Sequence, residues 1–217
     1  MLASVLFGCF LGMTVVTWLG LTQEIDDIIR IYAYSVRTDS LTAFMKCFTF
    51  LGQPKTIIAV IAVLVVLPGT RSFLGIPLTV GAGINEIIKF LLKRIIRRPR
   101  PDKTMFLVKQ GGFSYPSGHA NGSMVVYGYF AYKLLTGKSP GLKALGILAA
   151  ILPFLIGISR VYLGVHYASD VLAGWLLGGT MLTLMIMVDR SRQAGENPGT
   201  GIQGQKQEPE EKEEIQR

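Results

Sequence analysis

The sequence predicts an all-α integral membrane protein, a six-transmembrane-helix bundle with interfacial amphipathic helices. Half of the 217 residues are apolar, and they gather in long runs. Six runs approach or reach the ~20 residues that a helix needs to cross a bilayer. They cover residues 1–21, 57–68 with their flanks, 73–92, 117–135, 142–158 and 171–188. A soluble bundle of buried helices is disfavoured because too little polar surface remains to solvate it.

The first two runs depart from a simple membrane span. Residues 1–21 lack the charged start of a cleaved signal peptide, and their apolar stretch exceeds the usual ~7–15 residues, so they are predicted to be a retained span. The second run is the weakest of the six, because its uninterrupted apolar core is short and Pro68-Gly69 closes it.

Residues 23–55, between these two runs, mix polar and apolar side chains at helical spacing. One apolar set is Ile25, Ile28, Ile29 and Tyr32, opposite Asp26, Asp27 and Arg30. The other set is Leu41, Phe44, Met45, Phe48 and Leu51. We expect one or two amphipathic helices that lie in the membrane interface or, alternatively, pack on the bundle without touching lipid.

Charge and composition divide the chain into a membrane domain, residues 1–189, and a charged tail, residues 190–217. The tail is rich in Gly, Pro, Gln and Glu, cannot bury enough apolar surface to fold, and is predicted to be disordered.

The net charge of +8 suits anionic lipid headgroups. The bilayer is therefore an expected partner, whereas no nucleic-acid motif is present and no particular oligomeric state is predicted.

Only two histidines occur in the chain, and each lies in a cluster of residues suited to phosphate chemistry. The three clusters are Lys93-x6-Arg100-Pro101, Pro116-Ser117-Gly118-His119 and Ser159-Arg160-x5-His166-x3-Asp170. Histidine is the side chain best suited to proton transfer or nucleophilic attack near neutral pH. The two histidines therefore point to an active site.

With six spans, all three clusters meet on one side of the membrane, because they flank the third and fifth connecting loops. Basic residues in short connections favour a cytoplasmic location for the opposite side. These residues are Arg71, Lys133, Lys138, Lys143, Arg190 and Arg192. The sequence thus favours a multi-pass protein of the cell membrane with an extracytoplasmic active site.

The residue types at this side predict a site for a phosphoryl group. His166 and Asp170 are four residues apart and share a helical face, so the carboxylate can hold the imidazole tautomer and sharpen a nucleophile. Arg160 carries a planar fork that matches a phosphate group. Further positive charge comes from Lys93 and Arg100.

The fourth span begins beside these groups. Ser117 and Gly118 open it, where free backbone N–H groups and the helix dipole attract an anion, and His119 is placed to donate a proton. The inventory requires no metal, and the two well-separated cysteines, Cys9 and Cys47, show no metal-ligand spacing.

The three clusters resemble the signature of the type 2 phosphatidic acid phosphatase superfamily, and the six-span layout is similar to its membrane branch, over about residues 1–189. The matching residues are Lys93, Arg100, Pro101, Pro116, Ser117, Gly118, His119, Ser159, Arg160, His166 and Asp170. The resemblance implies a metal-independent enzyme without a cofactor that faces the extracytoplasmic side.

The resemblance also implies roles. His166 would attack phosphorus and form a phosphohistidine, Asp170 would orient it, and His119 would protonate the departing oxygen. The phosphate oxygens would be held by Lys93, Arg100, Ser117, Gly118 and Arg160. The run Arg94, Arg97 and Arg98 is interpreted as solvated or facing headgroups. Glu86, an ionisable group in the third span, is expected either to have a functional role or to pair with Lys89.

The expected function is hydrolysis of a membrane lipid phosphate, a phosphomonoester or diphosphate such as a phosphatidylglycerophosphate-like lipid. Undecaprenyl pyrophosphate is the alternative substrate. A rival of another class is a non-enzymatic lipid-binding or transport protein on the same fold; the presence of every signature residue argues against it.

Overall fold

The computed structural model describes residues 1–137 and 139–196. Throughout this part of the chain the regular structure is helical. The elements are α1 (Leu2–Trp18), α2 (Gln23–Ser35), α3 (Asp39–Leu51), α4 (Pro54–Val66), α5 (Pro68–Thr70), η1 (Arg71–Gly75), α6 (Ile76–Ile96), η2 (Lys103–Met105), α7 (Gly118–Thr136), α8 (Pro140–Tyr162) and α9 (Ala168–Glu196).

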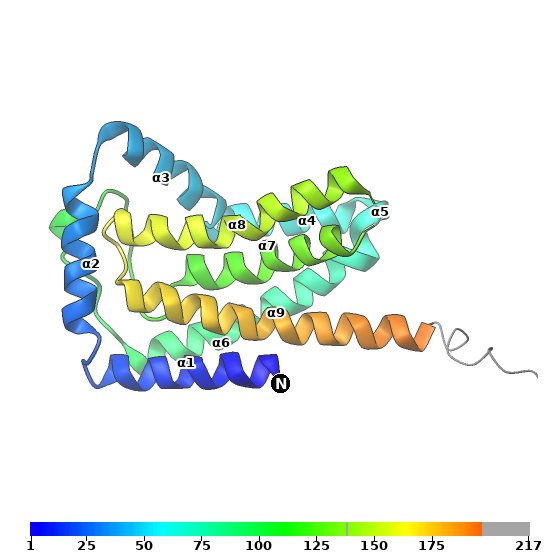
Figure 1. The fold of residues 1–217 in the computed structure, drawn as a ribbon, viewed down its shortest axis with the longest axis horizontal. Helices are drawn as coiled ribbons and strands as arrows, with labels where there is room; N and C mark the ends of the chain where they lie inside the picture. The colour runs from blue at the N-terminus through cyan, green and yellow to red at the C-terminus, as the bar shows by residue number, and fades with distance from the viewer. Residues whose placement is uncertain (138, 197–217) are drawn as a thin grey trace, which may run out of the picture.

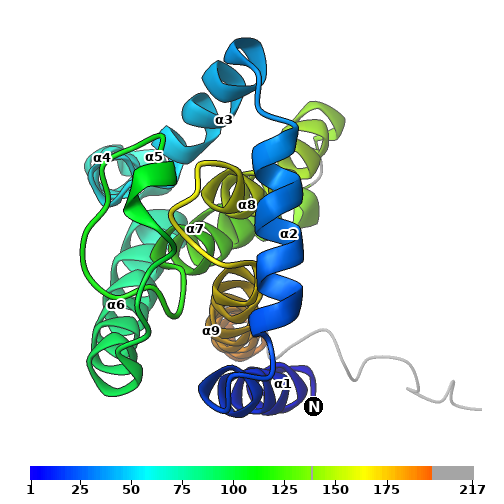
Figure 2. The ribbon, with the colours of Figure 1, turned by 90° about the vertical axis from the view of Figure 1, so that its left-hand side faces the viewer.

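The long helices run side by side along the longest axis of the molecule, and α2 crosses one end of them (Figure 1). Helix α7 is at the centre, packed against α8, α9 and α6. Seen from the end, α2 lies across α8 and α9, near the connection between α6 and α7 (Figure 2). Helix α2 therefore covers the neighbouring ends of α8 and α9.

The structure confirms several apolar helices but not the predicted count of six spans. Three stretches are long and apolar enough to cross a membrane: Pro68–Ile96, Pro140–Tyr162 and Ala168–Gly195. The number rises to five if two bent helix pairs, α1 with α2 (90°) and α3 with α4 (49°), each count as one span. Helix α7 is not among them, since it buries polar side chains such as Asn121 and Ser123 inside the bundle.

The C-terminal boundary differs from the prediction. Residues 190–217 were expected to be disordered, but α9 continues to Glu196, so residues 190–196 are helical. The rest of the predicted tail, residues 197–217, lies outside the described residues. Helix α9 thus continues beyond the apolar run of the last span into the first charged residues of the predicted tail.

Residues 23–55 contain the two expected amphipathic helices, α2 and α3, followed by the start of α4. The apolar side of α2 is exposed at Ile25, Ile28 and Tyr32, whereas Asp26 is buried with 1% exposure. The polar side of α2 therefore faces the protein. This orientation favours a helix whose apolar side meets lipid.

Two glycines bring α9 against α7. A Cβ atom at Gly174 would lie 2.7 Å from the carbonyl oxygen of Ser117, and one at Gly178 would lie 2.6 Å from that of Asn121. The close approach lets the N–H of Ser117 donate to the carbonyl oxygen of Asp170 at 2.9 Å. Packing of these helices thus joins two of the predicted phosphate-site clusters.

Candidate active site

Six of the eight predicted site residues line one cavity at the end of the bundle covered by α2. Its volume is about 470 Å³. The six are Lys93, Arg100, Gly118, His119, Arg160 and His166. The other two, Ser117 and Asp170, are wholly buried beside the cavity and do not line it. All three sequence clusters therefore meet at one place, as predicted.

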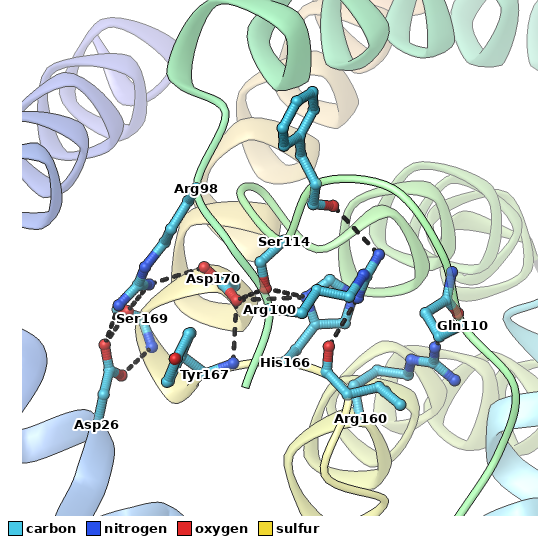
Figure 3. Close-up of polar contacts among 12 residues, drawn as sticks. Asp26, Arg98, Arg100, Gln110, Ser114, Arg160, His166, Tyr167, Ser169 and Asp170 are labelled. Carbon is cyan, nitrogen blue, oxygen red and sulfur yellow. Dashed lines mark hydrogen bonds and ion pairs between the residues drawn. The ribbon is translucent and has the colours of Figure 1, made fainter. Parts of the chain in front are cut away.

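His166 precedes α9, and its geometry fixes the tautomer of the imidazole (Figure 3). Its Nε2 lies 3.0 Å from Nη1 of Arg100. A guanidinium can only donate, so Nε2 accepts and the ring proton is on Nδ1. Nδ1 in turn lies 3.3 Å from Oδ2 of Asp170. The nitrogen with the free electron pair therefore faces the cations of the cavity.

Burial keeps this imidazole uncharged. His166 is 2% exposed. The loss of solvent lowers the pKa of His166 to about 3, although hydrogen bonding to Asp170 acts in the opposite direction. A neutral ring at physiological pH is the form that can act as a nucleophile.

Asp170 receives hydrogen bonds from several directions, which fix its carboxylate. Its Oδ2 accepts from the hydroxyl of Ser114 and from the backbone N–H of Tyr167 at 2.9 Å. Its Oδ1 accepts from Nη1 of Arg98 at 2.8 Å. The carboxylate is wholly buried, so these donors replace the water that it lacks.

Arg98 corrects one interpretation of the sequence, since it is not solvated or turned toward headgroups. Its side chain is 11% exposed and its guanidinium bridges two carboxylates, Asp170 at 2.8 Å and Asp26 at 2.7 Å. The reason is the chain path: α6 ends at Ile96, and the next residue, Arg97, has a left-handed backbone conformation (φ 50°). The residue that follows this turn enters the end of the bundle.

The three predicted cations make contacts with uncharged groups. Lys93 donates to the carbonyl oxygen of Phe113 at 2.7 Å. Arg100 donates to that of Val165 at 2.6 Å, and burial lowers the pKa of Arg100 to about 10. Among the described residues, no carboxylate forms an ion pair with Lys93, Arg100 or Arg160. Their charge is thus suited to an anionic ligand.

Arg160 is 2% exposed at the end of α8. Its two terminal nitrogens donate to the hydroxyl of Thr49 and to the side-chain carbonyl of Gln110. Its Nε is buried and meets no hydrogen-bond partner among the residues that the structure describes. Unused donor capacity on a buried guanidinium indicates room for a further acceptor.

The start of α7 completes the cavity. Gly118 and His119 line it, next to Lys89, which pairs with Glu86 as expected. Ser117 is the residue preceding α7, and its hydroxyl is buried without a hydrogen-bond partner. Within the part of the chain that the structure describes, His, Cys, Asp and Glu side chains form no group of three or more that could hold a metal ion.

Sequence reasoning missed Ser114 and Asp26 and misplaced Arg98. Ser114 lies in a loop outside the three clusters. Asp26 was recognised only as part of the polar side of an amphipathic helix. A signal for Asp26 was present: a helix whose apolar side meets lipid must turn its acidic side chains away from the lipid.

Comparison with known proteins identifies the family. The model of the PAP2 superfamily matches residues 74–193, and the chain belongs to this superfamily. The matched region contains all three clusters, so the resemblance expected from the sequence is confirmed.

Individual relatives are also similar. Phosphatidylglycerophosphatase B of Bacillus subtilis is 34% identical over 182 residues, covering 80% of this chain and 87% of the relative. Undecaprenyl-diphosphatase of Sulfolobus acidocaldarius is 32% identical over 155 residues, covering 69% and 71%. The crystal structure of the transmembrane PAP2-type phosphatidylglycerolphosphate phosphatase of Bacillus subtilis superposes with a TM-score of 0.79 at 31% identity, covering 87% of this chain and 96% of that chain. These relatives confirm the expected likeness to the membrane branch of the superfamily. The several apolar helices agree with a membrane protein.

Proposed function

We propose that the protein is a membrane lipid phosphate phosphatase that works through a phosphohistidine on His166 without a metal ion. One observation carries the proposal. A neutral, buried imidazole turns the free electron pair of Nε2 into a cavity in which Lys93, Arg100 and Arg160 form no ion pair with a carboxylate of the described residues. The PAP2 family match and the phosphatase relatives support the same chemistry.

The first half of the reaction forms the intermediate. The phosphate enters among Lys93, Arg100 and Arg160, and Arg100 leaves Nε2 to bind a phosphate oxygen. Nε2 of His166 then attacks phosphorus as the bond to the lipid oxygen breaks. His119, made cationic by the adjacent phosphate dianion, gives a proton to that oxygen, and the lipid leaves as an alcohol or a monophosphate.

The second half regenerates the enzyme. A water molecule attacks phosphorus, His119 takes one of its protons, and the bond from phosphorus to Nε2 breaks to release inorganic phosphate. Throughout, Asp170 accepts from the Nδ1 proton. While Nε2 is bonded to phosphorus the ring is positively charged, and the carboxylate stabilises that charge.

A second cavity supports a lipid substrate. It has a volume of about 590 Å³, lies between α4, α6 and α7, and is lined mainly by apolar side chains. Its wall shares Pro54, Lys89 and Gly118 with the catalytic cavity. A hydrocarbon chain in this groove would be continuous with a phosphate in the site.

The preferred substrate is phosphatidylglycerophosphate, with undecaprenyl pyrophosphate as the second candidate. Both classes are represented in the names of similar proteins. A non-enzymatic lipid-binding or transport protein is disfavoured, because the described site keeps the nucleophile, its carboxylate and the proton donor together.

We also propose six spans for residues 1–189, a cell-membrane location and an extracytoplasmic active site. Helices α1 and α4 lie alongside the longer helices, which supports their counting as spans (Figure 1). The basic side chains Lys133 and Arg190 lie at the end of α7 and near the end of α9 respectively, away from the catalytic cavity, as the positive-inside rule requires for a cytoplasmic end.

The test is phosphate release by the purified protein in detergent with EDTA present. The substrates are phosphatidylglycerophosphate, phosphatidic acid and undecaprenyl pyrophosphate, and His166→Ala is the control. Release that persists in EDTA and disappears in His166→Ala supports the proposal, and the ranking of kcat/KM selects the substrate. Release that requires an added metal, or that survives in His166→Ala, contradicts it.

A further inference from the structure

A continuous series of charged contacts leads from helix α2 to the imidazole of His166 (Figure 3). Asp26 accepts from Nη2 of Arg98 at 2.7 Å. Arg98 donates from Nη1 to Asp170 at 2.8 Å. Asp170 lies 3.3 Å from Nδ1 of His166. The family signature in the sequence contains only the last two of these residues.

Asp26 also holds the start of α9. Its Oδ1 accepts from the backbone N–H of Ser169 at 2.9 Å, and its Oδ2 accepts from the hydroxyl of the same residue. An acidic side chain is stabilised at a helix N-terminus by the free N–H groups and the helix dipole. Asp26 therefore positions the helical turn that carries Asp170, although it comes from a distant part of the sequence.

The charges in this series do not cancel. Asp26 and Asp170 are 1% and 0% exposed, and the guanidinium of Arg98 lies between them. Burial opposes the charge on Arg98, but the two carboxylates outweigh it and raise the pKa of Arg98 above its ordinary value. Two carboxylates and one guanidinium leave one net negative charge next to His166.

We propose that Asp26 is a positioning residue for the reaction. It holds Arg98 and the first turn of α9, so that Asp170 keeps the proton of His166 on Nδ1. Its charge also offsets Arg98, which leaves the charge of Asp170 free to stabilise the cationic phosphohistidine. This inference rests on the proposed roles of His166 and Asp170.

The central variant is Asp26→Asn, because the carbonyl oxygen of an asparagine can still accept from the N–H of Ser169, whereas its amide offers no charge to Arg98. A capping role alone therefore predicts wild-type kinetics. We expect kcat to fall about tenfold or more, equivalent to about 1.4 kcal/mol, with KM changed less than about twofold, because Asp26 does not line the phosphate cavity. The matched control is Asp27→Asn: Asp27 is adjacent on α2 but pairs with Arg30 and Gln23, and the control should keep wild-type kinetics.

A double variant tests whether Asp26 acts through Arg98. In an Arg98→Gln background, Asp26→Asn should lower kcat little further, since the link is already broken. Losses that multiply, a rise in KM with unchanged kcat, or wild-type kcat in Asp26→Asn would each overturn the proposal.

Two further measurements keep the test decisive. Thermal unfolding in the same detergent establishes that each variant is folded. If Asp26→Asn does not fold, Arg98→Lys replaces it: a lysine ammonium cannot reproduce the planar fork that bridges two carboxylates, so kcat should fall with KM preserved. Wild-type kcat in Arg98→Lys overturns the proposal.

The His166→Ala variant is assayed in parallel and separates this inference from the proposed function. If His166→Ala stays active, the proposed function fails. If His166→Ala is inactive while Asp26→Asn has wild-type kcat, only the role of Asp26 is refuted.

Discussion

Replacement of Ser114 by alanine tests how the carboxylate of Asp170 is oriented. Ser114 is wholly buried, and its hydroxyl donates to Oδ2 of Asp170, the oxygen nearest to Nδ1 of His166. Ser114→Ala removes this donor, and with it the 3.3 Å contact of the same hydroxyl with Nδ1 of His166, without adding volume. Asp170 keeps its contacts with Arg98 and the N–H of Tyr167, so its charge stays compensated. The perturbation is therefore a loss of orientation, not of charge.

The magnitude follows from the contact that is lost. A hydrogen bond to a charged group contributes about 1.5–3 kcal/mol. Because two other donors remain on Asp170, we expect the lower half of this range. At about 1.4 kcal/mol for each factor of ten in rate, kcat falls about 10- to 40-fold. KM should change little, since Ser114 does not line the phosphate cavity.

The assay is steady-state phosphate release in detergent, with Ser123→Ala as the matched control. Ser123 is equally buried, but its hydroxyl donates to a backbone carbonyl within α7, that of Ala120 at 3.2 Å. Ser123→Ala should lose about 1 kcal/mol of stability and Ser114→Ala about 1.5–3 kcal/mol, and only Ser114→Ala should lose turnover. Equal kcat values for the two variants would refute the reasoning, as would a Ser114→Ala defect confined to KM.

Three further predictions concern the catalytic residues. Asp170→Asn should lower kcat by about 10²–10⁴-fold, because an amide no longer stabilises the charged ring; near wild-type kcat would contradict this role. His119→Ala should slow lipids with poor leaving groups more than activated aryl phosphates, and equal loss across both would contradict its role as an acid. With the pKa of His166 lowered to about 3 from the usual ~6.5, the folded state binds fewer protons between these values, so stability falls as the pH drops through that window. Histidine ¹⁵N NMR of His119→Asn should accordingly show a neutral ring protonated on Nδ1 at pH 5; an imidazolium midpoint near pH 6.5 would contradict it.

The sequence was sufficient to predict the helical class and the meeting of the three clusters. Long apolar runs require helices in a bilayer, and i, i+4 spacing places His166 and Asp170 on one side of a turn. Their convergence with Arg100 and Arg160 followed from the order of spans. These predictions depend on the spacing of residues and on the alternation of spans across the membrane, and both can be taken directly from the amino-acid sequence.

The remaining site residues depend on the path of loops and on the orientation of one helix. Arg97, Arg98 and Arg100 are chemically alike in the sequence, and only the left-handed turn at Arg97 decides which guanidinium enters the bundle. Asp26 was visible as the polar side of α2, but periodicity does not say whether that side faces water or protein. The predicted count of six spans is not confirmed, since α7 is not among the helices that are long and apolar enough to cross a membrane by themselves.

Trapping the covalent intermediate tests the central claim most directly. The wild-type protein is mixed with substrate, quenched in alkali during the first turnover, and digested for mass spectrometry. The account predicts one phosphoryl group on the peptide that contains His166, absent from His166→Ala and slower to disappear in His119→Ala. Turnover without a phosphorylated His166, or a phosphoryl group on another residue, would contradict the account.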